Sequence, residues 1–150
     1  MKVSRPLASL VSLFLLASCG GGGGHGGSGP TAPPQGNTII AAVTLADLSG
    51  AGLLNATVSL DGKKIGEMDW STLPSGCGAG CIVQAAAQDV SSGTHTLTVT
   101  AVKLAGGHGT YAVFGLVVVT PPSGTPRQID LPQQQVTLQA GSTVQYPITI

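Results

Sequence analysis

The segment THTLTVTAVK at residues 94–103 decides the fold class of this chain. Apolar and polar side chains alternate along it, which is the period-two pattern of a β-strand with one buried and one solvent-facing side. Its threonines and valines are β-branched and favour an extended backbone further. The side predicted to be buried carries Leu97, Val99 and Ala101, and the opposite side carries Thr96, Thr98 and Thr100.

Five more short segments have β-strand character. They cover residues 38–45, 55–60, 63–67, 81–87 and 111–120. Asp61 and Gly62 stand between two of them and form a favoured hairpin turn. The segment 111–120 is apolar on both sides, which predicts a central or covered strand. No stretch after residue 18 has convincing helical periodicity, so we predict an all-β sandwich or barrel.

Two of these regions resemble bacterial immunoglobulin-like domains. Residues 58–66, VSLDGKKIG, match the strand, Asp-Gly turn and return strand of that family, and residues 92–101, SGTHTLTVTA, are similar to one of its later strands. Order and spacing agree with the family from Thr38 to Thr120. The resemblance implies an immunoglobulin-like antiparallel β-sandwich over residues 38–120. It implies no particular activity, because sandwiches carry many unrelated functions.

The final segment, residues 121–150, leaves two interpretations open. Residues 121–126, PPSGTP, are typical of a linker. Residues 136–150 alternate again and resemble the first two strands of another domain of the same family. These strands either complete the first sandwich or open a second domain of a longer chain. Two strands left alone would be only marginally stable in water.

The first residues of the chain have the pattern of a targeting signal. Lys2 and Arg5 precede an apolar segment at residues 7–17, which has the length of a secretory signal peptide and is shorter than the roughly 20 residues of a membrane-spanning helix. The run LASC at residues 16–19 resembles the lipobox of bacterial lipoproteins. That resemblance implies cleavage of the signal and acyl chains, palmitate among them, on Cys19 and its new amino group. The alternative is an ordinary signal peptide in which Cys19 is incidental.

The lipobox also implies a location. The signal peptide would cover residues 1–18, and several acyl chains would hold the mature protein firmly on a membrane. An Asp after the lipidated Cys favours the inner membrane in enterobacteria, so Gly20 favours the outer membrane, at its periplasmic face or at the cell surface. Residues 19–37 are rich in Gly and Pro and are predicted to be a disordered tether, with a root-mean-square reach of roughly 20–25 Å.

Cys77 and Cys81 are the remaining cysteines. Two nearby cysteines of an exported protein usually pair, and the Gly-Ala-Gly between them allows a tight turn. We therefore predict a structural disulfide. A redox-active pair is disfavoured because the Cys-x-x-Cys spacing is absent, and a metal site is disfavoured because two thiols need further ligands.

The other titratable residues form no recognisable catalytic or metal-binding motif. His25 lies in the tether, His95 opens a strand and is expected to be partly buried and hydrogen-bonded, and His108 lies in a Gly-rich hairpin loop. Glu67 and Asp69 could share a Ca²⁺ ion with a loop, but no Asp-x-Asp-x-Asp spacing accompanies them. We predict no catalytic residue, no metal and no cofactor.

Charge and aromatic content limit the expected partners. Without Lys2 and Arg5 the chain has four basic and six acidic residues, a formal charge of −2, so nothing favours nucleic acid or anionic lipid. Trp70, the only tryptophan, is either a packing residue or a candidate ligand contact.

We expect a non-catalytic, membrane-anchored lipoprotein of the bacterial cell envelope with a structural, adhesive or protein-interaction role and a protein or glycan partner. The alternative is a carbohydrate-binding or accessory module of a larger surface enzyme. Such a module would need exposed aromatic residues on one face, and aromatic residues make up only 3% of the chain, which disfavours it.

Overall fold

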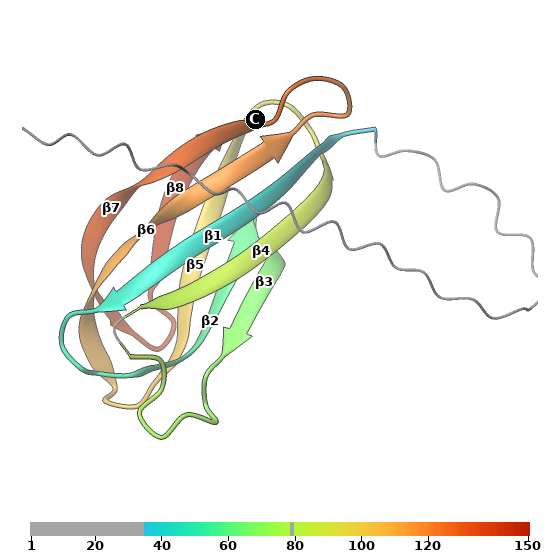
Figure 1. Cartoon of the computed structure of the whole chain (residues 1–150). Coiled ribbons are helices and arrows are strands. Elements are labelled where there is room, and N and C mark those ends of the chain that lie inside the picture. The colour runs from blue at the N-terminus through green and yellow to red at the C-terminus, as the bar shows by residue number, and fades with distance from the viewer. Residues whose placement is uncertain (1–34, 79) are drawn as a thin grey trace, which may run out of the picture. The chain divides into compact units, whose positions relative to one another are not determined.

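The computed structural model describes residues 35–78 and 80–150, and all regular structure in this part is β-strand (Figure 1). The eight strands are β1 (Asn37–Asp47), β2 (Leu53–Leu60), β3 (Lys63–Asp69), β4 (Cys81–Val90), β5 (Thr94–Leu104), β6 (His108–Thr120), β7 (Arg127–Gln139) and β8 (Thr143–Thr149). The predicted signal peptide, Cys19 and the tether up to residue 34 lie outside the described residues. Within them, no helix is long and apolar enough to cross a membrane.

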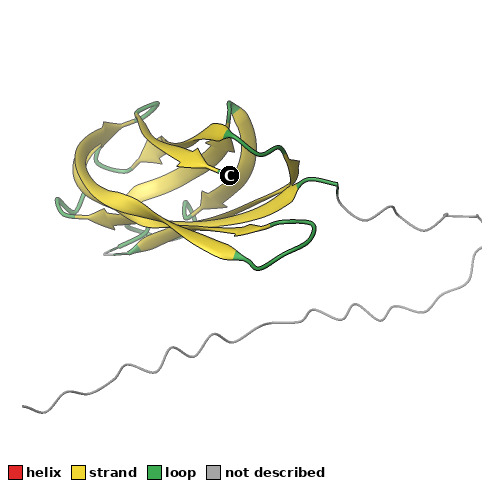
Figure 2. Cartoon of the chain, turned by 90° about the horizontal axis from the view of Figure 1, so that it is seen from above, coloured by secondary structure: helices red, strands yellow, loops and turns green. Residues whose placement is uncertain are grey.

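The strands form two antiparallel four-stranded sheets, with the orders β4-β1-β6-β7 and β3-β2-β5-β8. Figure 2 shows them as two packed layers. Only β2–β3 and β6–β7 are hairpins, and every other connection passes from one sheet to the other. The prediction of an all-β fold is confirmed for residues 35–78 and 80–150, and the two packed sheets have the arrangement of a β-sandwich. The loop before His108 is one of these crossings, so the predicted hairpin there is wrong.

The core between the sheets follows the alternation of the sequence. Leu97, Val99 and Ala101 of β5 are buried, as predicted. Tyr111 of β6 and Tyr146 of β8 are the largest fully buried side chains. The Tyr146 hydroxyl donates a hydrogen bond of 2.8 Å to the backbone oxygen of Val113, which gives its polar atom a partner inside the core.

The last two strands belong to this sandwich. β7 pairs with β6, and β8 pairs with β5, so each forms the edge of one sheet. Of the two interpretations left open by the sequence, the structure shows that these strands complete the first sandwich. The domain therefore extends past residue 120. The predicted strand from residue 136 actually begins at Arg127, because the Gln-rich segment 127–135 lies at an edge where one side of the strand faces solvent.

The strand β6 is central in its sheet, between β1 and β7, as its two apolar sides predict. One of those sides nevertheless faces outward. Phe114 is 36% exposed, and Leu116 and Val118 on the same side are half-buried. The sequence pattern thus identified a central strand whose outer side is not covered by any described residue.

The tether ends earlier than predicted. Asn37 is buried and begins β1, and its side-chain amide donates a hydrogen bond of 3.0 Å to the backbone oxygen of Val90. The backbone amides of Gln35 and Gly36 donate to the Asp89 carboxylate at 3.0 and 3.4 Å. These contacts fix the chain to the sandwich from Gln35, three residues before Thr38, where the sandwich was predicted to begin.

Candidate functional site

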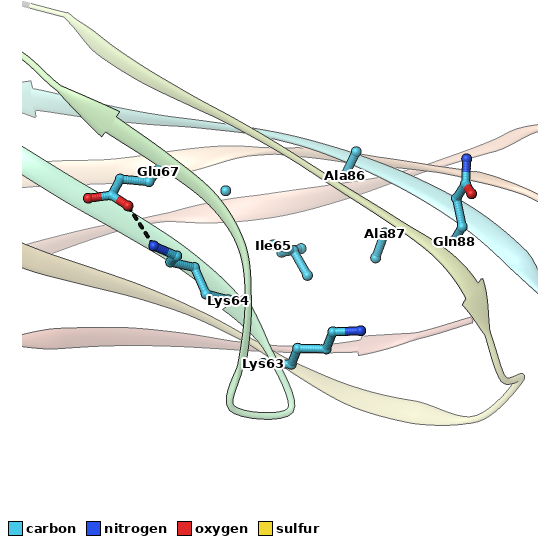
Figure 3. Close-up of a pocket in the computed structure, with 8 residues that line it drawn as sticks. Lys63, Lys64, Ile65, Glu67, Ala86, Ala87 and Gln88 are labelled. Atoms are coloured by element: carbon cyan, nitrogen blue, oxygen red, sulfur yellow. Dashed lines mark hydrogen bonds and ion pairs between the residues drawn. The ribbon is translucent and has the colours of Figure 1, made fainter.

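An open groove of about 620 Å³ runs between the edge strands β3 and β4, which belong to opposite sheets (Figure 3). Ile65 and Ala87 line it and pack against the core. Lys63 lies beside the β2–β3 turn, and Gln88 lies on β4 at the other side of the groove. Lys64 and Glu67 form an ion pair of 2.6 Å on β3. A smaller hollow of about 290 Å³ continues from Lys63 toward His95.

The groove exists because the two edge strands approach closely at one point and bend apart beyond it. At Gly66, a Cβ atom would lie 2.5 Å from the Gln84 backbone oxygen and 2.6 Å from the Ala85 Cβ, so only glycine fits. Ile65 is an extra residue of β3 in its pairing with β2. β4 carries an extra residue beside Asp89, whose φ is +56°. Such bulges bend a strand and open the sandwich beyond the Gly66 contact.

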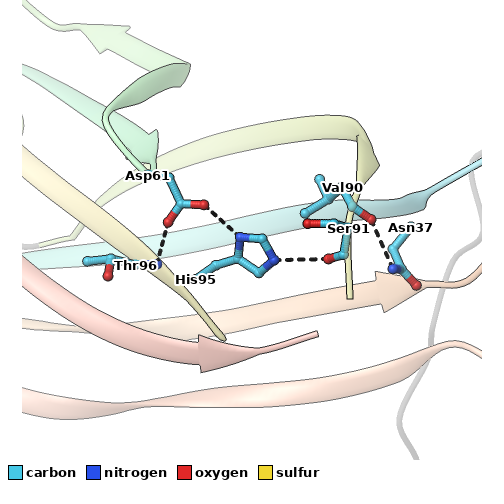
Figure 4. Close-up of polar contacts among 6 residues, drawn as sticks. All are labelled: Asn37, Asp61, Val90, Ser91, His95 and Thr96. Atoms are coloured by element: carbon cyan, nitrogen blue, oxygen red, sulfur yellow. Dashed lines mark hydrogen bonds and ion pairs between the residues drawn. The ribbon is translucent and has the colours of Figure 1, made fainter. Parts of the chain in front are cut away.

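His95 joins three segments beside the smaller hollow (Figure 4). Its Nδ1 lies 2.6 Å from an oxygen of Asp61 in the β2–β3 turn, and its Nε2 lies 2.9 Å from the backbone oxygen of Ser91. The second Asp61 oxygen accepts a hydrogen bond of 2.8 Å from the backbone amide of Thr96. Both imidazole nitrogens face acceptors, so the geometry favours the doubly protonated ring, which donates at both positions.

The pKa values of this pair shift in the directions that the contacts dictate. The Thr96 amide and the His95 ring hold the pKa of the Asp61 carboxyl below its usual value. The hydrogen bond to Asp61 raises the pKa of His95, against a smaller lowering by burial. His95 is thus the partly buried, hydrogen-bonded histidine that the sequence predicts. It serves to fasten the β2–β3 turn to the start of β5.

Cys77 and Cys81 are bonded to each other, as predicted, with their Cα atoms 5.6 Å apart. Cys81 is the first residue of β4, and the Cys77 backbone amide donates a hydrogen bond of 2.8 Å to the Leu53 oxygen. Both cysteines are buried. The disulfide therefore fastens the β3–β4 loop to one end of both sheets.

Trp70 is half-buried at the start of the same loop and packs against the core. Its backbone amide donates to the Leu54 oxygen at 2.7 Å, and its own oxygen accepts from the Leu73 amide at 2.9 Å. These contacts favour the packing role over the role of an exposed ligand contact.

Sequence reasoning missed the role of Asp47, the last residue of β1. One carboxylate oxygen accepts hydrogen bonds from the Ser49 and Gly50 amides at 2.9 and 2.8 Å, and the other accepts from the Gly52 amide at 2.8 Å and the Tyr111 hydroxyl at 3.3 Å. Burial raises the pKa of Asp47, but these hydrogen bonds lower it more, and the net shift is downward. An Asp before a Ser-Gly pair was the available signal.

The remaining candidates are dispersed. Glu67 is bound to Lys64 and to the Asn55 amide, and the Asp69 carboxylate accepts from the Ser71 amide at 2.8 Å. Among the described residues, no three His, Cys, Asp or Glu side chains lie close enough together to hold a metal ion. His25 lies outside the described residues.

All four edge strands are protected against further strand pairing. β3 and β4 carry the bulges beside the groove. β7 carries Pro132 where its register with β6 shifts, and β8 carries Pro147. Bulges and prolines at sheet edges discourage the addition of another strand.

No protein family, curated protein or solved structure matches this chain.

Proposed function

We propose that this protein is a non-catalytic lipoprotein of the bacterial cell envelope that acts by binding another protein through the surface of its sandwich. The observation that carries the interaction role is a group of exposed apolar side chains on one sheet. Ile40 is 54% exposed, Ile82 49% and Phe114 36%, and all three point outward from the sheet that contains β1. Exposed apolar patches of this kind mark sites of protein contact.

The contacts of the polar groups support a structural rather than a chemical use of those groups. Asp47 holds the β1–β2 loop, and Asp61 and His95 fasten a turn to β5. Each has partners from the backbone or from a neighbouring strand, so its hydrogen-bonding capacity is spent within the fold. The protected edges favour contact through a sheet face over addition of a strand.

The membrane anchor is supported by the LASC run at residues 16–19 after a basic and apolar leader. A mature chain that starts at Cys19 would present the sandwich from a Gly-rich and Pro-rich segment. We further propose that the sandwich is of the immunoglobulin-like kind, on the strength of its two antiparallel sheets and of the VSLDGKKIG and SGTHTLTVTA segments. It has eight strands, one more than the constant-type arrangement.

A glycan partner receives less support. The described aromatic residues do not form a platform on one face. Tyr111 and Tyr146 are buried in the core, Trp70 is half-buried in a loop, and Phe114 stands among aliphatic residues. For this reason we propose a protein partner.

Intact-mass measurement of the protein extracted from membranes tests the anchor. We expect the mass of a chain that begins at Cys19 with acyl groups added, and alkylation of Cys77 and Cys81 only after reduction. The matched variant Cys19→Ala should lose the acyl mass and leave the membrane fraction. An unmodified mass for the wild-type protein, or a Cys19→Ala variant that stays on the membrane, would refute the lipid anchor.

A further inference from the structure

The outer surface of the three neighbouring strands β4, β1 and β6 is an almost continuous apolar face. Cross-strand register places its side chains in rows, because directly opposed residues point to the same side of a sheet. Ile40 of β1 lies between Ala86 of β4 and Val118 of β6. The next row along β1 has Ala42 opposite Leu116, and the third has Thr44 between Ile82 and Phe114. The apolar face consists of Ile40, Ala42, Ile82, Ala86, Phe114, Leu116 and Val118.

The other sheet has an outer surface of a different kind. Thr57 of β2 is opposite Thr100 of β5, and Ser59 is opposite Thr98, with Gln145 of β8 beyond it. Hydroxyl and amide groups suit a surface that faces water. That sheet also exposes Met68 of β3 and Val102 of β5. The two outer surfaces differ in the three neighbouring apolar rows of β4, β1 and β6, and such a surface calls for a partner.

The apolar face carries no charge where a second copy would meet it. The outward positions of β4, β1 and β6 within the three rows hold only apolar residues, Thr44 and Gln84. The nearest charged side chain in register is Asp130, on the edge strand β7 opposite Leu116. In a two-fold interface every surface patch meets its own copy, so a charge near the axis would face a like charge. A neutral apolar surface is complementary to itself, whereas an anionic lipid surface would favour basic residues.

The size of the face limits the strength of such a contact. Three strands about 4.8 Å apart and about five residues of 3.4 Å each give a flat area of roughly 250 Å² per copy. Two copies would bury roughly 500 Å², which is below the area of a stable specific interface and fits a weak, transient one. Sheets pack face to face about 10 Å apart with strand directions within about 30°. Alanines beside the larger side chains of Ile40 and Phe114 leave space for the partner's side chains to interdigitate.

We propose that two copies of this chain pair through the apolar face of the sheet β4-β1-β6-β7, with two-fold symmetry. The proposal rests on the interaction role proposed above and names the partner. The buried area predicts a weak dimer that forms where copies are concentrated, as on a membrane.

Thiol-specific cross-linking of the full chain, expressed in a bacterium, tests the proposal. In Ala42→Cys, the new thiol lies on the central strand β1 in the middle of the face, and a short bismaleimide should link two copies into a dimer on a denaturing gel. The matched control is Thr98→Cys, which faces outward from the central strand β5 of the other sheet. We expect at least a fivefold higher dimer yield from Ala42→Cys. Equal yields from the two faces would overturn the proposal.

A charged residue placed on the apolar face provides a second test of the proposal. Adding Ile40→Lys to Ala42→Cys should reduce the dimer yield at least fivefold, while adding Thr57→Lys on the opposite sheet should leave it unchanged. Ile82→Lys, on the edge strand β4, repeats the test should Ile40→Lys fail to show native circular dichroism. Unchanged yield in a folded Lys variant would also overturn the proposal.

The outcomes separate this inference from the proposed function. Cross-linking of Ala42→Cys to a different protein, with no dimer, would refute self-association and leave the interaction role standing. No cross-linked product of any kind would contradict both. The lipid anchor is read independently from the intact mass, because cross-linking can be carried out in whichever fraction contains the protein.

Discussion

The close contact of β3 with β4 makes Gly66→Ala the sharpest test of how the sandwich closes. The added Cβ would lie 2.5 Å from the Gln84 backbone oxygen, 2.6 Å from the Ala85 Cβ and 2.8 Å from the Ala85 Cα. Ordinary contacts lie at 3.4–4 Å, so the two edge strands must separate by about 1 Å in a region packed at interior density. Backbone atoms cannot swing aside as the end of a side chain can. Overpacking of this kind costs about 1–3 kcal/mol of unfolding free energy.

Gly78→Ala is the matched control. Gly78 has no positive φ, and no atom lies within 4 Å of the position its Cβ would take. The same chemical change should therefore leave stability unchanged or raise it by up to about 1 kcal/mol, because alanine restricts the unfolded chain more than glycine does. The difference between the two variants isolates the steric contact from the change in the unfolded state.

Urea unfolding followed by circular dichroism and Trp70 fluorescence measures this difference. With a slope of about 1–3 kcal/mol per molar urea, we expect the midpoint of Gly66→Ala to fall by about 1 M relative to Gly78→Ala. The slope should not change, since both variants unfold the same sandwich. Equal midpoints for the two variants would refute the close approach of β3 to Gln84 and Ala85, and with it the origin of the groove.

Three further outcomes follow from single contacts. The pKa of His95 is raised from 6.5, so the stability that His95 adds is complete below pH 6.5 and is lost as the pH rises through the pKa of the folded state. The pKa of Asp61 is lowered from 3.8, so the stability that Asp61 adds is complete above pH 3.8 and is lost as the pH falls below it. The stability difference between wild type and His95→Gln should accordingly be largest between about pH 4 and 6.5, and a difference independent of pH would contradict the ion pair. Replacing Cys77 and Cys81 with Ser together should lower the unfolding free energy by about 2 kcal/mol, the entropy of closing a five-residue loop, and reductant should then have no effect on the variant's melting temperature. Asp47→Ala removes the acceptor for three loop amides, so it should lower the unfolding free energy by about 1–3 kcal/mol and speed hydrogen exchange at residues 48–52 only. Exchange at the wild-type rate in this variant would show that the loop does not depend on the carboxylate.

The local sequence pattern located the strands that have one buried and one solvent-exposed side. The alternation of residues 94–103 placed Leu97 and Val99 in the core, and Asp61-Gly62 gave a turn. The strand β7 was missed over residues 127–135, because Pro132 and three successive glutamines argue against a strand in isolation. An edge position with a register shift accommodates both, and no local signal shows that β6 will supply a partner.

At the candidate site, too, the sequence predicted some contacts and not others. The sequence predicted the Cys77–Cys81 bond, because the two residues are close along the chain, and the hydrogen-bonded His95, because it opens a strand. It did not predict that Asp61, 34 residues earlier, would be the partner of His95. It also did not predict that Gly66 would touch Ala85, since that contact joins edges of different sheets.

The amino-acid sequence by itself determined that the chain is all-β, where most strands lie and which side chains of β5 enter the core, because those properties depend on neighbours along the chain. Only the tertiary structure decided that residues 127–149 complete the same sandwich and that Ile40, Ile82 and Phe114 gather on one uncovered surface. Those properties depend on the pairing of β1 with β4 and β6. The free energy of that pairing is spread over cross-strand contacts between residues 36 to 82 positions apart in the sequence. No local pattern records partners at such separations.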